Sequence, residues 1–403
     1  MTTRNRRLRK KTPAPAATPR ARQRGGVALP ILGVLALAGL ASLIYGLTSD
    51  GAGPDIALLT VSYLFLLGIT QVGVVFAATL RLVEADWAKP WYRLAELSTL
   101  AFFPFAIAGF LFIVSVGADD LFYWLDATDL EHPSPWLDSG WLVARNLGAL
   151  LLFYGVAGYY TLTSLRPDLA SGDGTAIDHD AVERRLYLMS PIVIACFILS
   201  NTFLAWDFGM MLIPHWHSTV FPIHFWFGNV FAGTAALIAI VVVMRRVDGA
   251  KHFGPHQLKS LGMMITGFTL LWLYFFWAQF FVIWFGNLPH ETTPLWRQMY
   301  GHYGPWFWTM IAGCFFLPFA AFLFAVVKRS VVAMCVIAIA INVGIWTNKY
   351  LMIVPVFSPA DRPFDSWIDV TVSVGLAAAF LVTLVLLARR LPTYSAWEMA
   401  RES

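Results

Sequence analysis

Charged side chains are scarce in this chain, and their scarcity decides its class. They make up 13% of the 403 residues, whereas about 25% of a soluble domain is charged. Hydrophobic residues form blocks long enough to cross a bilayer, which takes about 20 residues per helix. Because an open strand would leave backbone groups unpaired in lipid, we expect an all-α polytopic membrane protein. About ten transmembrane helices are predicted, at residues 27–48, 57–80, 97–117, 141–164, 186–206, 219–244, 260–285, 306–327, 330–348 and 366–388.

Cysteine is equally rare. Cys196, Cys314 and Cys335 lie far apart within predicted spans and form no C-x-x-C or C-x-x-C-H pattern. This spacing excludes a disulfide framework, a covalently attached haem and the usual iron–sulfur ligand sets. No phosphate-binding G-x-x-x-x-G-K-[ST] or hydrolase G-x-S-x-G pattern occurs. His224 is the only histidine within a predicted span, so a haem held by two histidines is not expected. We expect no cofactor and no metal in this chain.

Positive charge is divided unevenly between the two predicted sides of the membrane. The side that carries both termini holds 24 of the 28 Lys and Arg residues, and the other side holds Arg145, Arg297, Lys349 and Arg362. The positive-inside rule then places both termini in the cytoplasm. We expect residues 1–26 to be a disordered basic cytoplasmic tail, 27–390 the transmembrane domain, and 391–403 a second cytoplasmic tail.

The net charge of +4 comes largely from the basic N-terminal tail. We therefore expect that tail to contact lipid headgroups, and we expect no nucleic-acid partner.

The order of the spans suggests two four-helix bundles, formed by spans two to five and six to nine, with the first and last spans as flanking helices. Each bundle has a glutamine within one of its first two helices, Gln71 and Gln279. Asn201, Asn229 and Asn342 lie inside predicted spans, where we expect them to form hydrogen bonds between helices.

Two groups of ionisable residues are candidates for proton transfer. Arg93 and Glu96 are three residues apart, so they share a helix face near the cytoplasmic end of the third span. They predict either a point of proton uptake or an ion pair that orients the helix.

The second group lies on the outer side and contains Asp207, His215, His217 and Glu291, with His290 and His224 nearby in the sequence. Carboxylates and imidazoles can pass protons in turn, since imidazole titrates near neutral pH. The alternative is an ordinary solvated loop.

Arg145 lies just inside the outer end of the fourth span, where a guanidinium needs a carboxylate, a carbonyl or a route to water. We expect a structural ion pair. The candidate partners are the acidic residues of the preceding segment, Asp119, Asp120, Asp126 and Asp138.

Three segments carry a recognisable pattern. Asp86-Trp87 is followed by Arg93 and Glu96; residues 207–219 read DFGMMLIPHWHST; and residues 279–292 read QFFVIWFGNLPHET. In this order they resemble the NrfD/polysulfide-reductase family of membrane subunits. More narrowly, they resemble the second NrfD-like subunit of bacterial alternative complex III, a quinol:cytochrome c oxidoreductase. Met211, His217 and His290 depart from the patterns of that subunit.

The resemblance implies a division of labour between subunits. The partners would be a second NrfD-like subunit, an iron–sulfur protein and a multihaem cytochrome c in the bacterial cytoplasmic membrane. Menaquinol or ubiquinol, haem c and iron–sulfur clusters would belong to those partner subunits. This chain would scaffold the membrane part and conduct protons. By position, the family's functional residues correspond to Arg93, Glu96, Asp207, His215, Gln279 and Glu291.

Two other functions remain open. The chain could be the quinone-binding membrane anchor of a molybdopterin/iron–sulfur oxidoreductase of the polysulfide reductase type. It could also be a transporter, which we rank last because no charge lies at a clear midplane position in the predicted spans.

Overall fold

The computed structural model describes residues 28–49, 55–125, 136–170, 177–213, 216–248, 254–287, 289–357 and 366–400, without the side chains of 28, 243–248, 289 and 290. Ten helical segments of this part are long and apolar enough to cross a membrane, and the described ranges contain no strand. The expected all-α polytopic fold is confirmed.

The helices are α1 (Ala28–Thr48), α2 (Ile56–Leu82), α3 (Lys89–Val116), α4 (Ala118–Leu121), α5 (Ser139–Ala170), α6 (His179–Asp207), α7 (Phe221–Asp248), α8 (Pro255–Gly286), α9 (Pro289–Met299), α10 (Gly304–Ile311), α11 (Leu317–Phe322), α12 (Ala325–Arg329), α13 (Val331–Phe357), α14 (Trp367–Arg390) and α15 (Ala396–Met399). Short turns adjoin them: the 3-10 turns η1 (Asp86–Ala88), η2 (Tyr123–Leu125), η3 (Met210–Leu212) and η4 (Gly301–Tyr303), and the π turn η5 (Ala312–Phe316). The eighth span is therefore interrupted, because η5 separates α10 from α11.

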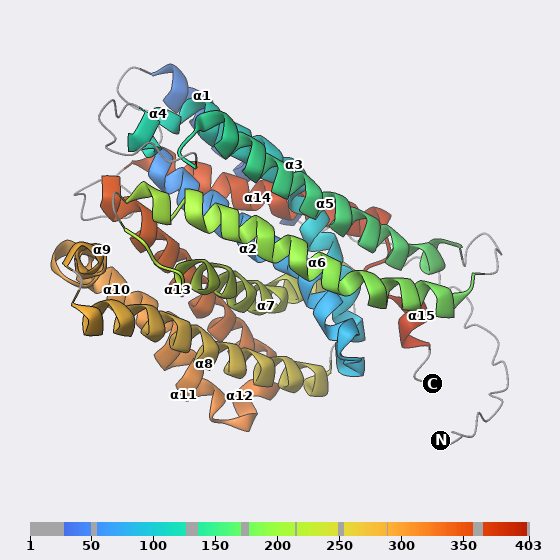
Figure 1. Cartoon of the computed structure of the whole chain (residues 1–403). Coiled ribbons are helices and arrows are strands. Elements are labelled where there is room, and N and C mark those ends of the chain that lie inside the picture. Colours follow the sequence, from blue (N-terminus) through green and yellow to red (C-terminus); the bar gives the residue numbers. More distant parts are fainter. Residues whose placement is uncertain are drawn as a thin grey trace.

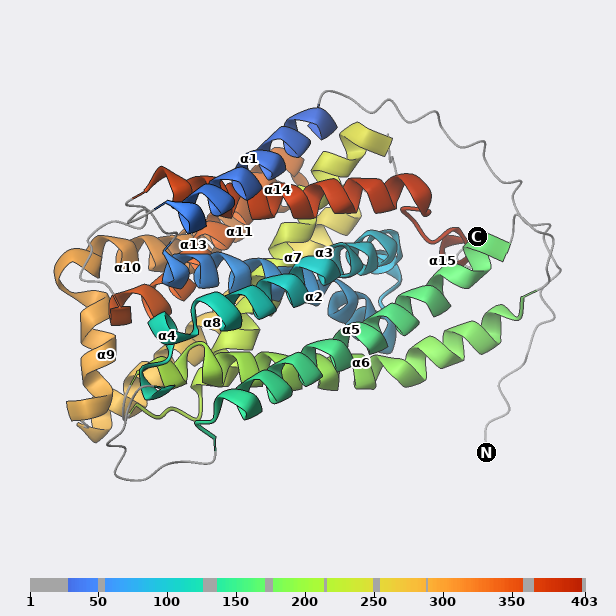
Figure 2. The same ribbon diagram turned by 90° about the horizontal axis from the view of Figure 1, so that it is seen from above.

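The long helices run roughly side by side (Figure 1). The short helices α4 and α9 lie at one end of the molecule and α15 at the other, as both views show (Figures 1 and 2). We call these the α9 end and the α15 end.

Helix packing follows the two-bundle arrangement expected from the sequence. Helices α2, α3, α5 and α6 form the first bundle, and α7, α8, the α10–α11 segment and α13 form the second. Helix α1 packs along α14, which packs on α2 and α3. Helix α2 touches both bundles and is the most buried span, so the seam between the bundles runs along it.

Local sequence signals fix where several helices begin and end. The carboxylate of Asp55 caps α2 by accepting the backbone N–H of Leu58 at 3.2 Å. The N–H of Asp55 donates to Asp369 at 3.0 Å, which ties the start of α2 to the start of α14. Asn287 ends α8 with φ 47°, in the left-handed region that asparagine tolerates better than most residues. That turn directs the chain from α8 into α9.

A chain of amides crosses the seam. Asn201 of α6 donates to Gln71 of α2 at 2.7 Å and accepts from Asn229 of α7 at 2.7 Å. Gly68 of α2 makes room for this chain, because a methyl group there would overlap the amide of Asn229. The expected interhelical hydrogen bonds are thus found for two asparagines. The expectation was wrong for Asn342, whose amide donates to Ala338 of its own helix at 2.8 Å.

The ninth span differs from its predicted range of 330–348. Helix α13 continues to Phe357, because the residues after the polar step at Asn348 and Lys349 are again apolar. Lys349 therefore lies inside a span and not in an outer loop.

Candidate functional sites

Five buried charged side chains meet at the α15 end of the first bundle. This α15-end cluster consists of Arg81, Arg93, Glu96, Asp168 and Glu398. Glu96 is fully buried and accepts hydrogen bonds from Arg81 and, at 3.2 Å, from Arg93. Arg93 also reaches Asp168 at 2.6 Å, and Arg81 reaches Glu398 at 2.9 Å. The cluster joins α2, α3, α5 and α15.

Two hydroxyl groups also accept hydrogen bonds from the guanidinium groups. The Ser164 hydroxyl accepts from Arg81 and from Arg93, each at 3.0 Å. The Tyr160 hydroxyl accepts from Arg81 at 3.1 Å and shares a hydrogen bond with Ser190 at 3.0 Å. Charges at this depth are tolerated only when they are paired and hydrogen-bonded. Every charge of this cluster is paired with an opposite one, and among the guanidinium nitrogens Nε of Arg93 lacks a hydrogen-bond partner in the described structure.

The segment that follows α14 closes the α15-end cluster. Trp397 donates its indole N–H to the carbonyl of Ser164 at 3.2 Å, and Asp168 accepts two backbone N–H groups from the start of α15. Burial opposes ionisation of Glu398, but the adjacent Arg81 guanidinium outweighs it and holds the pKa of Glu398 below its ordinary value. Its carboxylate therefore stabilises the fold above the unfolded-state pKa, and this contribution disappears as the pH falls through the folded-state pKa.

This geometry bears directly on Glu96 as a proton carrier. Its carboxylate faces two guanidinium groups, which stay charged at any pH that a protein experiences. Binding a proton at Glu96 would weaken both ion pairs. The cluster is therefore first a rigid connection between helices, and proton uptake at Glu96 stays a prediction.

A second ion pair lies at the α9 end of the first bundle. Arg145 of α5 makes a two-pronged contact with the Asp207 carboxylate, at 2.8 and 2.6 Å. Asn146 and the Trp136 indole, the latter at 3.0 Å, also donate to that carboxylate. The Arg145 guanidinium stacks on the Trp136 ring at 4.1 Å from its centroid. Asp207 and Arg145 are almost completely buried.

Arg145 thus forms an ion pair, but its expected partners were wrong. The carboxylate comes from the end of the neighbouring helix α6 and not from the preceding segment, because α5 and α6 pack along each other. Asp138 instead caps α5 by accepting the N–H of Trp141 at 2.7 Å. Asp119 and Asp120 lie in α4, and Asp126 lies outside the described residues.

The segments 207–219 and 279–292 meet at the α9 end. The backbone N–H of His217 donates to both carboxylate oxygens of Glu291, at 3.0 and 3.1 Å. The His217 ring is exposed, with its Nδ1 3.7 Å from Glu291. His215 and the side chain of His290 lie outside the described part. Since Asp207 bonds to α5 and Trp136, the described residues do not join the predicted outer set into one hydrogen-bonded cluster.

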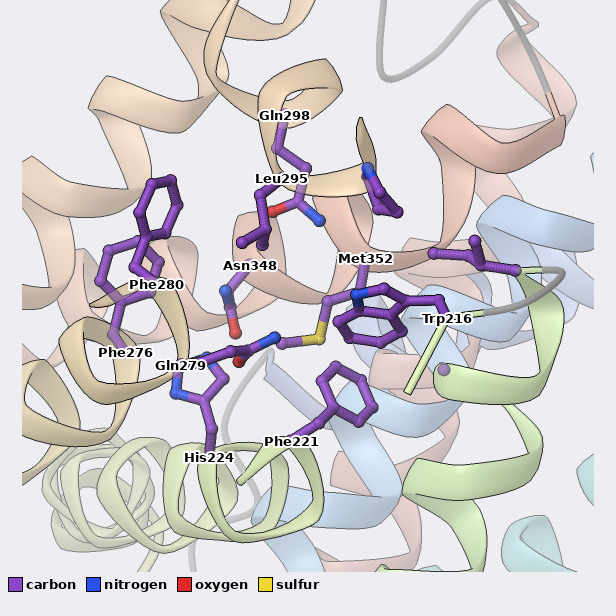
Figure 3. Close-up of a pocket in the computed structure, with 13 residues that line it drawn as sticks. Trp216, Phe221, His224, Phe276, Gln279, Phe280, Leu295, Gln298, Asn348 and Met352 are labelled. Carbon is purple, nitrogen blue, oxygen red and sulfur yellow. The ribbon is translucent and has the colours of Figure 1, made fainter. Parts of the chain in front are cut away.

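A polar pocket lies in the second bundle near the α9 end (Figure 3). Gln279 of α8, His224 of α7 and Asn348 of α13 point toward one another in it, with Trp216 and Gln298 at its edge. The space amounts to about 430 Å³ when its open mouth is included. Its enclosed part has room for about one water molecule. Gln279 therefore lines this pocket, a location that its position in the sequence did not predict.

Lys349 lies beside this pocket, inside α13, and contradicts the expectation that it belongs to an outer loop. It is 2% exposed, and its Nζ lies 3.5 Å from the centroid of the Phe225 ring on α7. No carboxylate of the described chain lies within ion-pair distance of it. The residues that precede Phe225 and Lys349 in the sequence, His224 and Asn348, both line the polar pocket.

The sequence alone did not identify several of these groups. Arg81 reads as an ordinary positive charge at a span end, and Glu398 lies in a segment predicted to be a tail. Asp168 and Asn146 gave no signal, because their partners lie on other helices. The polar interruption at Asn348 and Lys349 was visible but was interpreted as the end of a span.

Comparison with protein-family models matches residues 57–358 to the family described as "Polysulphide reductase, NrfD". The match runs from the start of α2 to the end of α13 and includes both bundles. Comparison with curated proteins gives no match. Members of the matched family act as membrane subunits of multi-subunit complexes with iron–sulfur and other redox partners. This chain belongs to the polysulphide reductase NrfD family and is a multi-pass membrane subunit of the polysulfide-reductase type.

Proposed function

We propose that this chain is a subunit of a quinol:cytochrome c oxidoreductase of the alternative complex III type. The observation that carries the proposal is the meeting of segments 207–219 and 279–292 through His217 and Glu291. These are two of the three segments whose sequence resembles the second NrfD-like subunit of that complex. The two segments are distant in the sequence, and their contact brings both resembling segments together at the α9 end.

In this proposal the chain lies in the bacterial cytoplasmic membrane with the α15 end on the cytoplasmic side. Its first role is to scaffold the membrane part, because ion pairs fasten the first bundle at both ends. The α9 end would carry the iron–sulfur protein and the multihaem cytochrome c. Haem c, iron–sulfur clusters and menaquinol or ubiquinol would be bound by partner subunits.

The second proposed role is proton conduction. Arg93 and Glu96 would serve the cytoplasmic side, and the residues of the outer side would be Asp207, His215, His217, Gln279 and Glu291. A Glu96→Gln variant that assembles should move fewer protons per electron in liposomes. Glu183→Gln, at an exposed position on α6, is the matched control and should behave as wild type. If Glu96→Gln moves as many protons per electron as wild type, Glu96 is not part of the proton path.

Purification of the native complex tests the proposal as a whole. We expect it to contain a second NrfD-like subunit, an iron–sulfur protein and a multihaem cytochrome c, and to reduce cytochrome c with a quinol. Co-purification with a molybdopterin subunit instead would contradict it.

The polar pocket favours one alternative, a quinone-binding anchor of the polysulfide reductase type. Gln279, His224 and Asn348 offer hydrogen-bonding groups for a quinone carbonyl. Because the enclosed space holds only about one water, a headgroup requires the pocket to widen. Photoaffinity labelling with a quinone analogue distinguishes the two functions: labelling on α7, α8 or α13 supports the anchor, and labelling of the paralogous subunit alone opposes it.

A further inference from the structure

The buried cations of this protein differ in how well neighbouring groups stabilise their charge. Arg81, Arg93 and Arg145 each contact at least one carboxylate. Lys349 has only the face of the Phe225 ring among its described contacts. A cation–π contact offsets only part of the free energy that is needed to move an ammonium group from water into a protein interior. Lys349 is therefore the buried cation with the weakest support for its charge.

The surroundings of Lys349 contain polar atoms that lack a partner in the described structure. Nδ1 of His224 and the indole nitrogen of Trp216 are both buried and unpaired. Both residues line the polar pocket, together with Asn348 (Figure 3). Buried polar groups without a protein partner are usually bound to water. The pocket therefore has room for a water molecule beside His224, near the α9 end.

The amide chain of the seam begins about one helical turn from the ring that Lys349 contacts. Phe225 and Asn229 are four residues apart on α7, so they lie on one helix face about one turn apart. Asn229 continues through Asn201 to Gln71. The two ends of this chain keep unpaired atoms, Oδ1 of Asn229 and Nε2 of Gln71. Phe225, whose ring Lys349 contacts, therefore lies on α7 between His224 of the pocket and Asn229 of the amide chain.

We propose that Lys349 and His224 form a proton-exchange site between the polar pocket and the seam. A hydronium ion on the seam side gives its proton to the neutral amine of Lys349 and becomes water, and the amine becomes an ammonium ion over the Phe225 ring. The ammonium passes the proton to Nδ1 of His224, and a water of the pocket takes a proton from the resulting imidazolium and becomes hydronium. The amine and the neutral imidazole are both regenerated. His224 directly precedes Phe225 on α7 and lines the pocket together with Asn348, the residue before Lys349. The inference deepens the proposed function, because it names the group that would carry protons in the second bundle.

Substitutions of Lys349 separate proton exchange from a structural role. Lys349→Met removes the amine with little change of volume. Lys349→Arg keeps a positive charge that cannot be released in proteins. If the lysine only packs and supplies charge, the arginine variant should behave as wild type. If it exchanges protons, both variants should lose proton transfer to the same extent. Lys328→Met, at a half-buried position in α12, is the matched control.

The experiment uses the native complex in proteoliposomes and measures subunit composition, quinol turnover and protons moved per electron. We expect both Lys349 variants to assemble, and their proton yield to fall to what quinol oxidation itself releases. Lys328→Met should keep the full yield. A full yield in Lys349→Arg overturns the inference, as does a wild-type complex that turns over without moving protons. A complex of different composition overturns the proposed function instead. In that case the number of protons moved per electron, measured with the electron donor of that complex, still tests the inference.

Discussion

The ion pair between Arg145 and Asp207 gives the sharpest stability prediction. Asp207 accepts four hydrogen bonds, two from Arg145 and one each from Asn146 and Trp136. Arg145→Met leaves a buried carboxylate with two neutral donors, and we expect it to cost about 3–5 kcal/mol of unfolding free energy. Asp207→Leu strands the guanidinium and should cost a similar amount. The double variant strands neither charge, so it should cost less than the sum of the single variants by about 3 kcal/mol.

Reversible unfolding of the purified full chain in mixed micelles, followed by tryptophan fluorescence, measures these differences. Arg166→Met is the matched control, because Arg166 lies on the same helix but is exposed. It should change the unfolding free energy by less than about 0.5 kcal/mol. If the losses of the two single variants add within about 0.5 kcal/mol in the double variant, the two charges are not coupled, and the reasoning from burial is wrong.

Three further predictions concern other parts of the fold. Glu398→Gln should lose about 1–3 kcal/mol of unfolding free energy at neutral pH. In thermal unfolding measured in parallel with wild type, this difference should disappear as the pH falls below about 4.5. A difference that does not depend on pH would contradict the role of its charge. Gly73→Ala should cost about 1–3 kcal/mol, because its methyl group would overlap the backbone of α3, whereas Gly158→Ala, with open space around it, should be neutral or stabilising in the same assay. Asn201→Leu should cost about 1–2 kcal/mol, and an unchanged unfolding free energy would show that the seam does not depend on its amide.

The parts of the fold that the sequence predicted depend on short-range rules. A run of about 20 apolar residues identifies a span wherever it lies, and a spacing of three residues predicted that Arg93 and Glu96 share a helix face. The partners of Arg145 and Arg81 depend on which helices pack together. Asp207 is 62 residues from Arg145, and Glu398 is 317 residues from Arg81. A single sequence contains no rule that joins residues at such separations.

Lys349 shows a different kind of limit. A lysine after a long apolar run is typical of a span end, and that rule placed it in an outer loop. The eight residues that complete α13 after it are mostly apolar. Whether such a lysine marks a boundary or is buried depends on what faces it, and the Phe225 ring lies on another helix.

The two bundles differ in how their polar groups are paired, and this difference bears on where a proton could move. In the first bundle the buried carboxylates are held by arginines at both ends. A proton can bind there only when a strong ion pair is given up, which favours rigidity. In the second bundle the buried polar groups are neutral or weakly paired, and two of the pocket's nitrogens lack a partner among the described residues. Exchange at such groups requires no ion pair to break. A proton path through this chain would therefore place its mobile steps in the second bundle and use the first as the frame that holds α2 and the seam in position.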